Sequence, residues 1–128
     1  MADVFISYSR ADAEYVQRLQ AELQSRGKDV WVDVEGIRDA ELFPSALRRA
    51  IEGSDAFVFV ITPESVHSAF CEQEVAHASG LNKRIVPLAL RQVPDDEIPD
   101  EIRFRNWIPA EADTSVERLL AALDTDLP

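Results

Sequence analysis

Short apolar runs alternate with amphipathic segments along the chain, and this alternation predicts strands that alternate with helices. The first run, Asp3–Tyr8, is rich in β-branched and aromatic side chains, and Ala56–Ile61 is the most continuously apolar run. A run of this kind is typical of a strand covered on both faces of a sheet. We therefore expect Ala56–Ile61 to be a central strand. The other strands are expected at Lys28–Asp33, Arg84–Leu90 and Trp107–Ile108.

The segments between these strands carry apolar residues at helical spacing. In the first segment three of them share one face: Val16, Leu19 and Leu23. Ser9 and Asp12 have the spacing of a capping box at the start of this helix, and Gly27 is a typical helix end. The later helices are expected at 44–53, at 68–79 and from 115 onward, and the longest loops at 34–43 and 92–106.

Regular alternation of strands and helices predicts an α/β fold with a parallel sheet covered by helices on both faces. Because crossovers between parallel strands are right-handed, we expect a flavodoxin-like, doubly wound, five-stranded sheet. Pro87 lacks a ladder donor, so its strand is expected near a sheet edge or with an irregularity. Ligands of such sheets bind beyond the carboxyl ends of the strands. Four segments are expected there: Tyr8–Arg10, Asp33–Arg38, Ile61–Glu64 and Leu88–Gln92.

The composition indicates one acidic globular domain. Of the 128 residues 46% are hydrophobic, and the net charge of −11 disfavours binding to nucleic acid or to an anionic membrane surface. The apolar runs are too short to span a bilayer. A single cysteine, Cys71, and the lack of an export signal favour the cytoplasm. We expect one domain over residues 1–128, which is also consistent with the N-terminal module of a longer protein.

Five motifs in a fixed order carry a family resemblance. They are Asp3–Ser9 (DVFISYS), Val30–Asp33 with the irregular loop Val34–Phe43, Ser68-x-x-Cys71-x-x-Glu74, Lys83–Leu88 (KRIVPL) and the region of Trp107. Together they cover nearly the whole chain, and in this order they resemble the motifs of Toll/interleukin-1 receptor (TIR) domains. The motif that ends at Glu74 is similar to the one that carries the catalytic glutamate in NAD-cleaving members, including bacterial ones.

This resemblance implies one of two functions. Some TIR domains are non-enzymatic scaffolds that signal by homotypic assembly through the BB loop, which corresponds here to Val34–Phe43. Others, once self-associated, act as NAD glycohydrolases that cleave NAD into nicotinamide and ADP-ribose or a cyclic isomer. NAD would then be the substrate, and neither a metal nor a separate cofactor is implied. A role in signalling, innate immunity or antiphage defence is implied by the family likeness alone.

Two positions depart from the family pattern. Ala40 lies in the BB-loop segment where many relatives have a glycine. Phe70 lies four residues before Glu74, where several enzymatic relatives have a tryptophan. The second departure keeps an aromatic ring at that position.

Helical spacing places Phe70, Glu74 and His77 on one stripe. The neighbouring stripe is expected to face the sheet: Cys71, Val75 and Ala78. A carboxylate can stabilise the oxocarbenium-like ribosyl cation that forms as nicotinamide leaves, and a ring can stack on the substrate. By resemblance, Glu74 is the catalytic residue and Phe70 a substrate-binding residue. The spacing alone favours a solvated glutamate and a peripheral core phenylalanine; the family motif favours the catalytic interpretation.

Three further residues are candidate substrate contacts. By resemblance, Ser9 and Arg10 line the nucleotide side of the cleft, with Arg10 near a phosphate. Ser9 is also a typical helix cap, and Arg10 is equally consistent with a surface arginine. Asp33 ends the second strand, a position common to ligand contacts and to turn-forming aspartates.

Other chemistry is less well supported by the sequence. Cys71 is expected to be a buried packing residue, Ser68 a helix cap and Trp107 a core residue. His67 and His77 have no third matching ligand, so no metal site is expected. The chain lacks a G-x-G-x-x-G loop, which disfavours a dehydrogenase. A phosphoacceptor receiver domain is rejected because no acidic pair follows the first strand.

Overall fold

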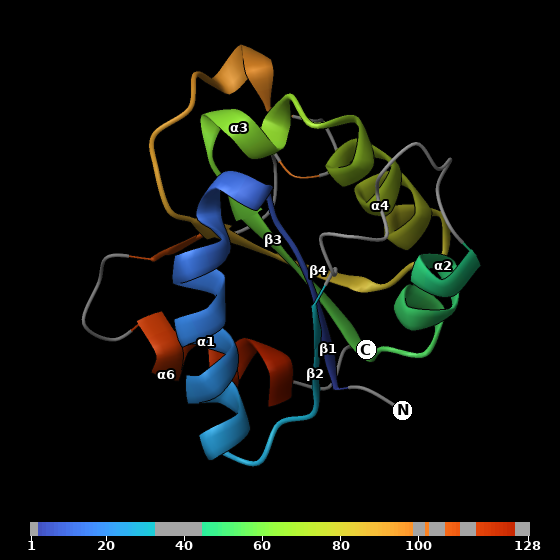
Figure 1. The fold of residues 1–128 in the computed structure, drawn as a ribbon, viewed down its shortest axis with the longest axis vertical. Helices are drawn as coiled ribbons and strands as arrows, with labels where there is room; N and C mark the ends of the chain where they lie inside the picture. Colours follow the sequence, from blue (N-terminus) through green and yellow to red (C-terminus); the bar gives the residue numbers. More distant parts are fainter. Residues whose placement is uncertain (1–2, 33–44, 99–101, 103–106, 111–114, 125–128) are drawn as a thin grey trace.

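A computed structural model describes residues 3–32, 45–98, 102, 107–110 and 115–124; the side chains of 45–48, 69–70, 95, 115 and 124 lie outside this description. Its sheet has five parallel strands in the order β2-β1-β3-β4-β5 (Figure 1). The strands are β1 Val4–Ser7, β2 Val30–Val32, β3 Ala56–Ile61, β4 Arg84–Ala89 and β5 Ile108–Pro109. The predicted flavodoxin-like, doubly wound sheet is therefore confirmed.

Helices cover both faces of this sheet (Figure 1). On one side lie α1 (Ala13–Ser25) and α6 (Ser115–Asp124), and on the other lie α2 (Ser45–Glu52) and α4 (Ala69–Gly80). All six residues of β3 are buried, as expected for a central strand covered on both faces.

Successive strand residues point to opposite faces, so the sheet divides the interior into two cores. Phe5, Phe57 and Phe59 contribute to the core on the α4 side, and their sequence neighbours contribute to the core on the α1 side. Phe5 stacks between Trp31, at 5.1 Å between ring centroids, and Phe57, at 5.5 Å. This stack fixes three adjacent strands against one another directly beneath the carboxyl end of β1.

The start of α1 differs from the expected capping box. Ser9 accepts a hydrogen bond from the backbone N–H of Ala11 at 3.3 Å, and a short 3₁₀ helix, η1 (Arg10–Asp12), precedes the α-helix. Asp12 does not reach back to the cap, because its buried carboxylate contacts Thr62 and Arg91 on other segments. The helix end was predicted correctly: Gly27 follows it with φ of +86°, a conformation that favours glycine.

One helix was missed in the sequence. Residues Pro63–Val66 form the short helix α3 between β3 and α4. Thr62 caps it: its Oγ1 accepts from the Ser65 backbone N–H at 3.1 Å, while the Ser65 hydroxyl accepts from the Thr62 N–H at 2.9 Å. The reciprocal pair is a capping box with serine where glutamate or glutamine is usual, so the pattern was not apparent.

The last strands confirm the expectation for Pro87. Strand β4 pairs with β3 along all six of its residues but with β5 only at Leu88 and Ala89. Pro87 thus lies just before a short edge pairing. The edge strand is displaced by one residue from the expected Trp107–Ile108, and the loop before it contains one 3₁₀ turn, η3 (Asp95–Glu97).

Candidate active site at the carboxyl edge

The predicted catalytic residue, Glu74, lies in the middle of α4 and is fully buried. Its Oε1 accepts a hydrogen bond of 2.6 Å from the hydroxyl of Ser7, the last residue of β1. The oxygen Oε2 is buried as well. A carboxylate in this position faces the carboxyl edge of the sheet, and the alternative of a solvated helix glutamate is wrong.

Helical geometry explains this burial. Cys71, Val75 and Ala78 are all buried against the sheet, as predicted. Glu74 follows Cys71 by three residues and precedes Ala78 by four, so it belongs to the same face as these three. Its assignment to a neighbouring stripe was the error. The polar side chain is tolerated there because Ser7 meets it from the strand below.

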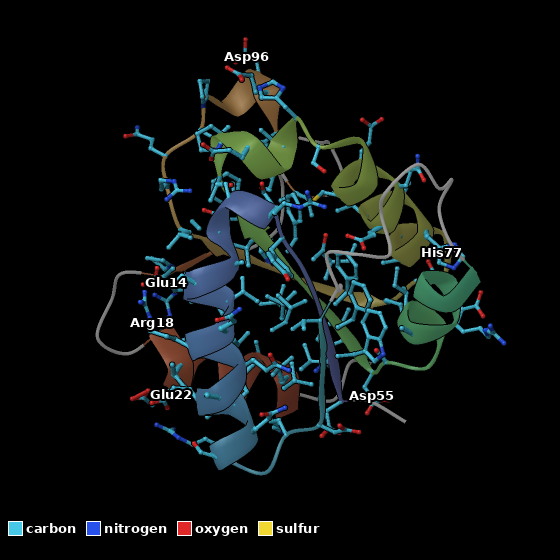
Figure 2. The ribbon with its side chains drawn as sticks, viewed as in Figure 1. Glu14, Arg18, Glu22, Asp55, His77 and Asp96 are labelled. Carbon is cyan, nitrogen blue, oxygen red and sulfur yellow. The ribbon has the colours of Figure 1, made fainter. Side chains whose placement is uncertain are left out.

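Of the other two members of the expected stripe, His77 is the one whose side chain the structure describes. His77 is directed toward α2 (Figure 2), where its Nε2 lies 3.2 Å from Oε2 of Glu52. The side chain of Phe70 lies outside the described residues, so its predicted proximity to Glu74 stays a prediction.

Two of the candidate substrate contacts lie close to Ser7 in the sequence. Ser9 comes two residues after Ser7 and is buried in its capping role, and Arg10 is exposed on η1. Asp33 and the loop Val34–Phe43 lie outside the described residues. The structure therefore brings Ser7 to Glu74, which sequence reasoning missed because Ser7 was read only as part of a strand motif.

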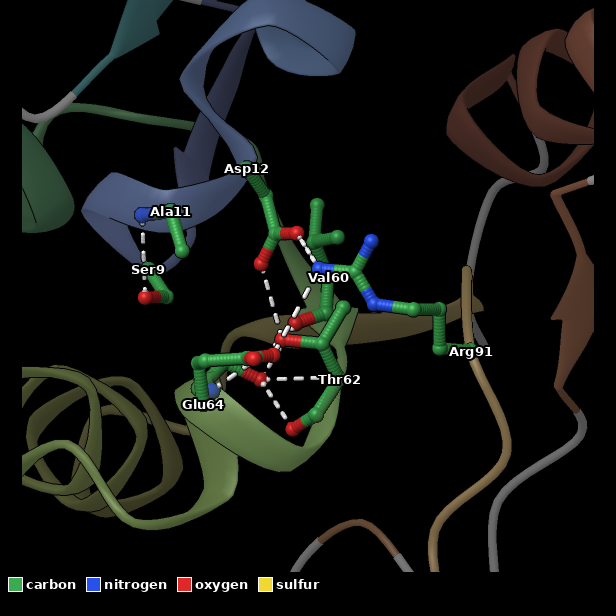
Figure 3. Close-up of polar contacts among 8 residues, drawn as sticks. Ser9, Ala11, Asp12, Val60, Thr62, Glu64 and Arg91 are labelled. Carbon is green, nitrogen blue, oxygen red and sulfur yellow. Dashed lines mark hydrogen bonds and ion pairs between the residues drawn. The ribbon is translucent and has the colours of Figure 1, made fainter.

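A second buried carboxylate, Asp12, lies at the same edge of the sheet (Figure 3). Its Oδ2 accepts from the Thr62 hydroxyl at 2.8 Å, and its Oδ1 accepts from Nη2 of Arg91. The same nitrogen of Arg91 lies 3.4 Å from Oε1 of Glu64. Thr62 follows β3 and Arg91 follows β4, so Asp12 ties the loops after β1, β3 and β4 together.

The chain segments of this network were foreseen, but its contacts were not. Thr62, Glu64 and Arg91 belong to the segments expected at the carboxyl edge. The partners of Asp12 lie 50 and 79 residues away in the sequence, so no local pattern connects them. The sequence instead suggested a local capping role for Asp12, and the structure overturns it.

A hollow lies beside this network at the ends of β4 and β5. Its lining includes Arg91, Val93 and Trp107 but not Glu74. The indole N–H of Trp107 donates to the carbonyl oxygen of Ile102 at 3.0 Å, and its ring packs against the core as expected. Among the described residues no group of three His, Cys, Asp or Glu side chains is arranged to hold a metal ion.

The comparisons with known proteins agree with this fold. A family model described as the TIR domain matches residues 4–120, so the chain belongs to the TIR domain family. A Toll-related receptor TIR domain from Hydra magnipapillata has the same fold, with a TM-score of 0.79 at 22% identity over 98% of this chain and 100% of that one.

Two curated relatives carry an activity in their names. The NAD(+) hydrolase sarm1 of Drosophila melanogaster is 30% identical to this chain, over 91% of it. The NAD(+) hydrolase tir-1 of Caenorhabditis elegans is 33% identical, over 80% of it. The chain spans 10% and 12% of these two relatives, respectively. No helix among the described residues is long and apolar enough to cross a membrane.

Proposed function

We propose that this TIR domain is an NAD glycohydrolase that cleaves NAD into nicotinamide and ADP-ribose or a cyclic isomer. The observation that carries the proposal is the buried carboxylate of Glu74, which accepts a 2.6 Å hydrogen bond from Ser7 at the edge of the sheet where ligands of this architecture bind. The two relatives named NAD(+) hydrolases give independent support.

The main requirement of NAD cleavage is a negative charge close to the sugar that reacts. As the bond between nicotinamide and ribose breaks, positive charge develops on the sugar, and a nearby carboxylate stabilises it. A buried carboxylate interacts more strongly with that charge than a surface carboxylate, because water screens it less. Glu74 is therefore the proposed catalytic residue.

The remaining roles follow from the family motifs. Ser9, Arg10 and Asp33 are proposed to contact the substrate, and Phe70 to stack on it. NAD is the substrate, and the reaction needs no separate cofactor. We further propose activation by self-association with other TIR domains through Val34–Phe43, in cytoplasmic signalling or defence.

The test is release of nicotinamide from NAD by concentrated protein, with and without a crowding agent that promotes assembly. The variant Glu74→Gln is expected to lower the rate by about 100-fold or more, the scale of removing one transition-state electrostatic contact. Glu72→Gln is the matched control, because Glu72 is an exposed glutamate on the same helix. It is expected to retain full activity.

Persistence of NAD under all these conditions would contradict the proposal, as would equal rates for the Glu74→Gln variant and the unchanged chain. Either result would leave the non-enzymatic scaffold as the function, to be tested by homotypic association of the purified domain.

A further inference from the structure

Ser7, which donates a hydrogen bond to Glu74, is an unusual residue for its position. Ser7 lies on β1 two residues after Phe5, so both point to the α4 side of the sheet. The positions around it on this face are filled by apolar side chains, and Ser7 itself is fully buried. A buried hydroxyl must find a partner to offset its lost hydration, and here that partner is the carboxylate of Glu74.

We propose that Ser7 is a positioning residue for the reaction of Glu74, an inference that rests on the proposed function. A glutamate side chain turns about three single bonds, and its terminal torsion is broad. The hydrogen bond from Ser7 fixes Oε1 to the end of a central strand and so sets the direction in which the carboxylate presents its charge. Such preorganisation contributes to the rate because no reorientation is needed in the transition state.

The geometry of the contact fits this role. At 2.6 Å, the distance between Ser7 Oγ and Glu74 Oε1 lies in the range of charge-assisted O–H···O⁻ hydrogen bonds. The donor is uncharged, so it orients the carboxylate while leaving its formal negative charge in place. A lysine or arginine in the place of Ser7 would neutralise the charge that the proposed reaction uses.

The first experiment compares Ser7→Ala with Ser54→Ala in the NAD-cleavage assay. Ser54 is a matched control, since it is 2% exposed and its hydroxyl also donates a 2.6 Å hydrogen bond, to the carbonyl oxygen of Ala50. It precedes β3 and so lies at the opposite edge of the sheet. Ser7→Ala is expected to lower kcat by about 10- to 100-fold, the scale reported for a misplaced reacting group.

Two readouts separate positioning from a merely structural role. In Ser7→Ala the KM is expected to stay within about threefold of the original value, because Ser7 acts through Glu74 rather than on NAD. In the Glu74→Gln background, Ser7→Ala is expected to cause no further loss. Ser7→Cys, which keeps the size and a weak donor, is expected to lie between serine and alanine in kcat. Thermal unfolding of every variant checks that it is folded.

The outcomes distinguish this inference from the function on which it rests. Loss of activity in Glu74→Gln together with full kcat in Ser7→Ala overturns the positioning role and leaves the proposed function intact. An equal loss in Ser54→Ala, or a raised KM at unchanged kcat in Ser7→Ala, overturns it as well. Absence of Glu74-dependent cleavage in the unchanged chain overturns both.

Discussion

Asp12 and Glu74 are both buried carboxylates at the carboxyl edge of the sheet, yet they are held in different ways. Asp12 contacts the guanidinium of Arg91 and the hydroxyl of Thr62, and Glu74 accepts from the hydroxyl of Ser7. A guanidinium neutralises the charge of its partner, whereas a hydroxyl orients a carboxylate and leaves its charge in place. We therefore expect Asp12 to stabilise the fold, and we propose Glu74 for the chemistry.

Removing the guanidinium of Arg91, which pairs with Asp12, is expected to have the largest effect on stability. Arg91→Met keeps much of the side-chain volume but leaves Asp12 buried beside Thr62 without the guanidinium. Breaking a fully buried pair costs about 3–5 kcal/mol, and because Arg91 is 48% exposed we expect a loss of about 2 kcal/mol in the free energy of unfolding. Urea denaturation at neutral pH measures this loss.

The control for that variant is an exposed pair on α1. Arg18 lies 3.2 Å from Glu14, and both side chains are largely exposed (Figure 2). Arg18→Met is expected to change the free energy of unfolding by less than about 0.5 kcal/mol. Equal losses in the free energy of unfolding for Arg91→Met and Arg18→Met would show that the pair of Asp12 and Arg91 stabilises the fold no more than a surface ion pair does.

Thr62→Val tests the second contact of Asp12 and is expected to have an intermediate effect. The substitution removes the hydroxyl that donates to Asp12 and that caps the backbone N–H of Ser65. We expect a loss of about 1–2 kcal/mol in the free energy of unfolding, with Thr62→Ser nearly unchanged because it keeps the hydroxyl. A loss in Thr62→Ser as large as in Thr62→Val would attribute the effect to packing instead.

Glu74→Gln is expected to change the stability least, and it gives the clearest test of the difference between Asp12 and Glu74. Glu74→Gln keeps an oxygen that can accept from Ser7 and removes a buried negative charge, so the free energy of unfolding should be unchanged or raised by up to about 1 kcal/mol. The same variant is expected to lose NAD cleavage. Calorimetry and the nicotinamide assay on one preparation test both statements, and a clear loss of stability would mark Glu74 as a structural residue.

The sequence predicted the sheet well because its strands are local patterns. The run Ala56–Ile61 identified the central strand, and the alternation around it indicated the doubly wound arrangement. Helix α3 was missed because its cap uses Ser65 in an unusual role. Local patterns do not predict the contacts of a side chain that can bind either its own helix or distant residues. Asp12 binds Thr62 and Arg91 instead of capping its own helix.

For the site, the sequence supplied the residue type but not its surroundings. The family motif selected Glu74, and helical spacing placed it near the core-facing residues, but spacing gives direction around a helix rather than depth below a surface. The contact with Ser7 joins residues 67 positions apart and depends on how α4 lies across β1. Only the packed structure contains that information.

On helix α4, the residues before and after Glu74 hold the backbone in place. Cys71, Val75 and Ala78 are packed into the core on the same face, and a packed core resists small displacements. The helix backbone at Glu74 therefore cannot advance toward a ligand without extracting three apolar neighbours. With its backbone held by the core and its carboxylate by Ser7, Glu74 has little room to move, and an adjustment that brings a reacting sugar within its reach has to come from the ligand or from other parts of the chain.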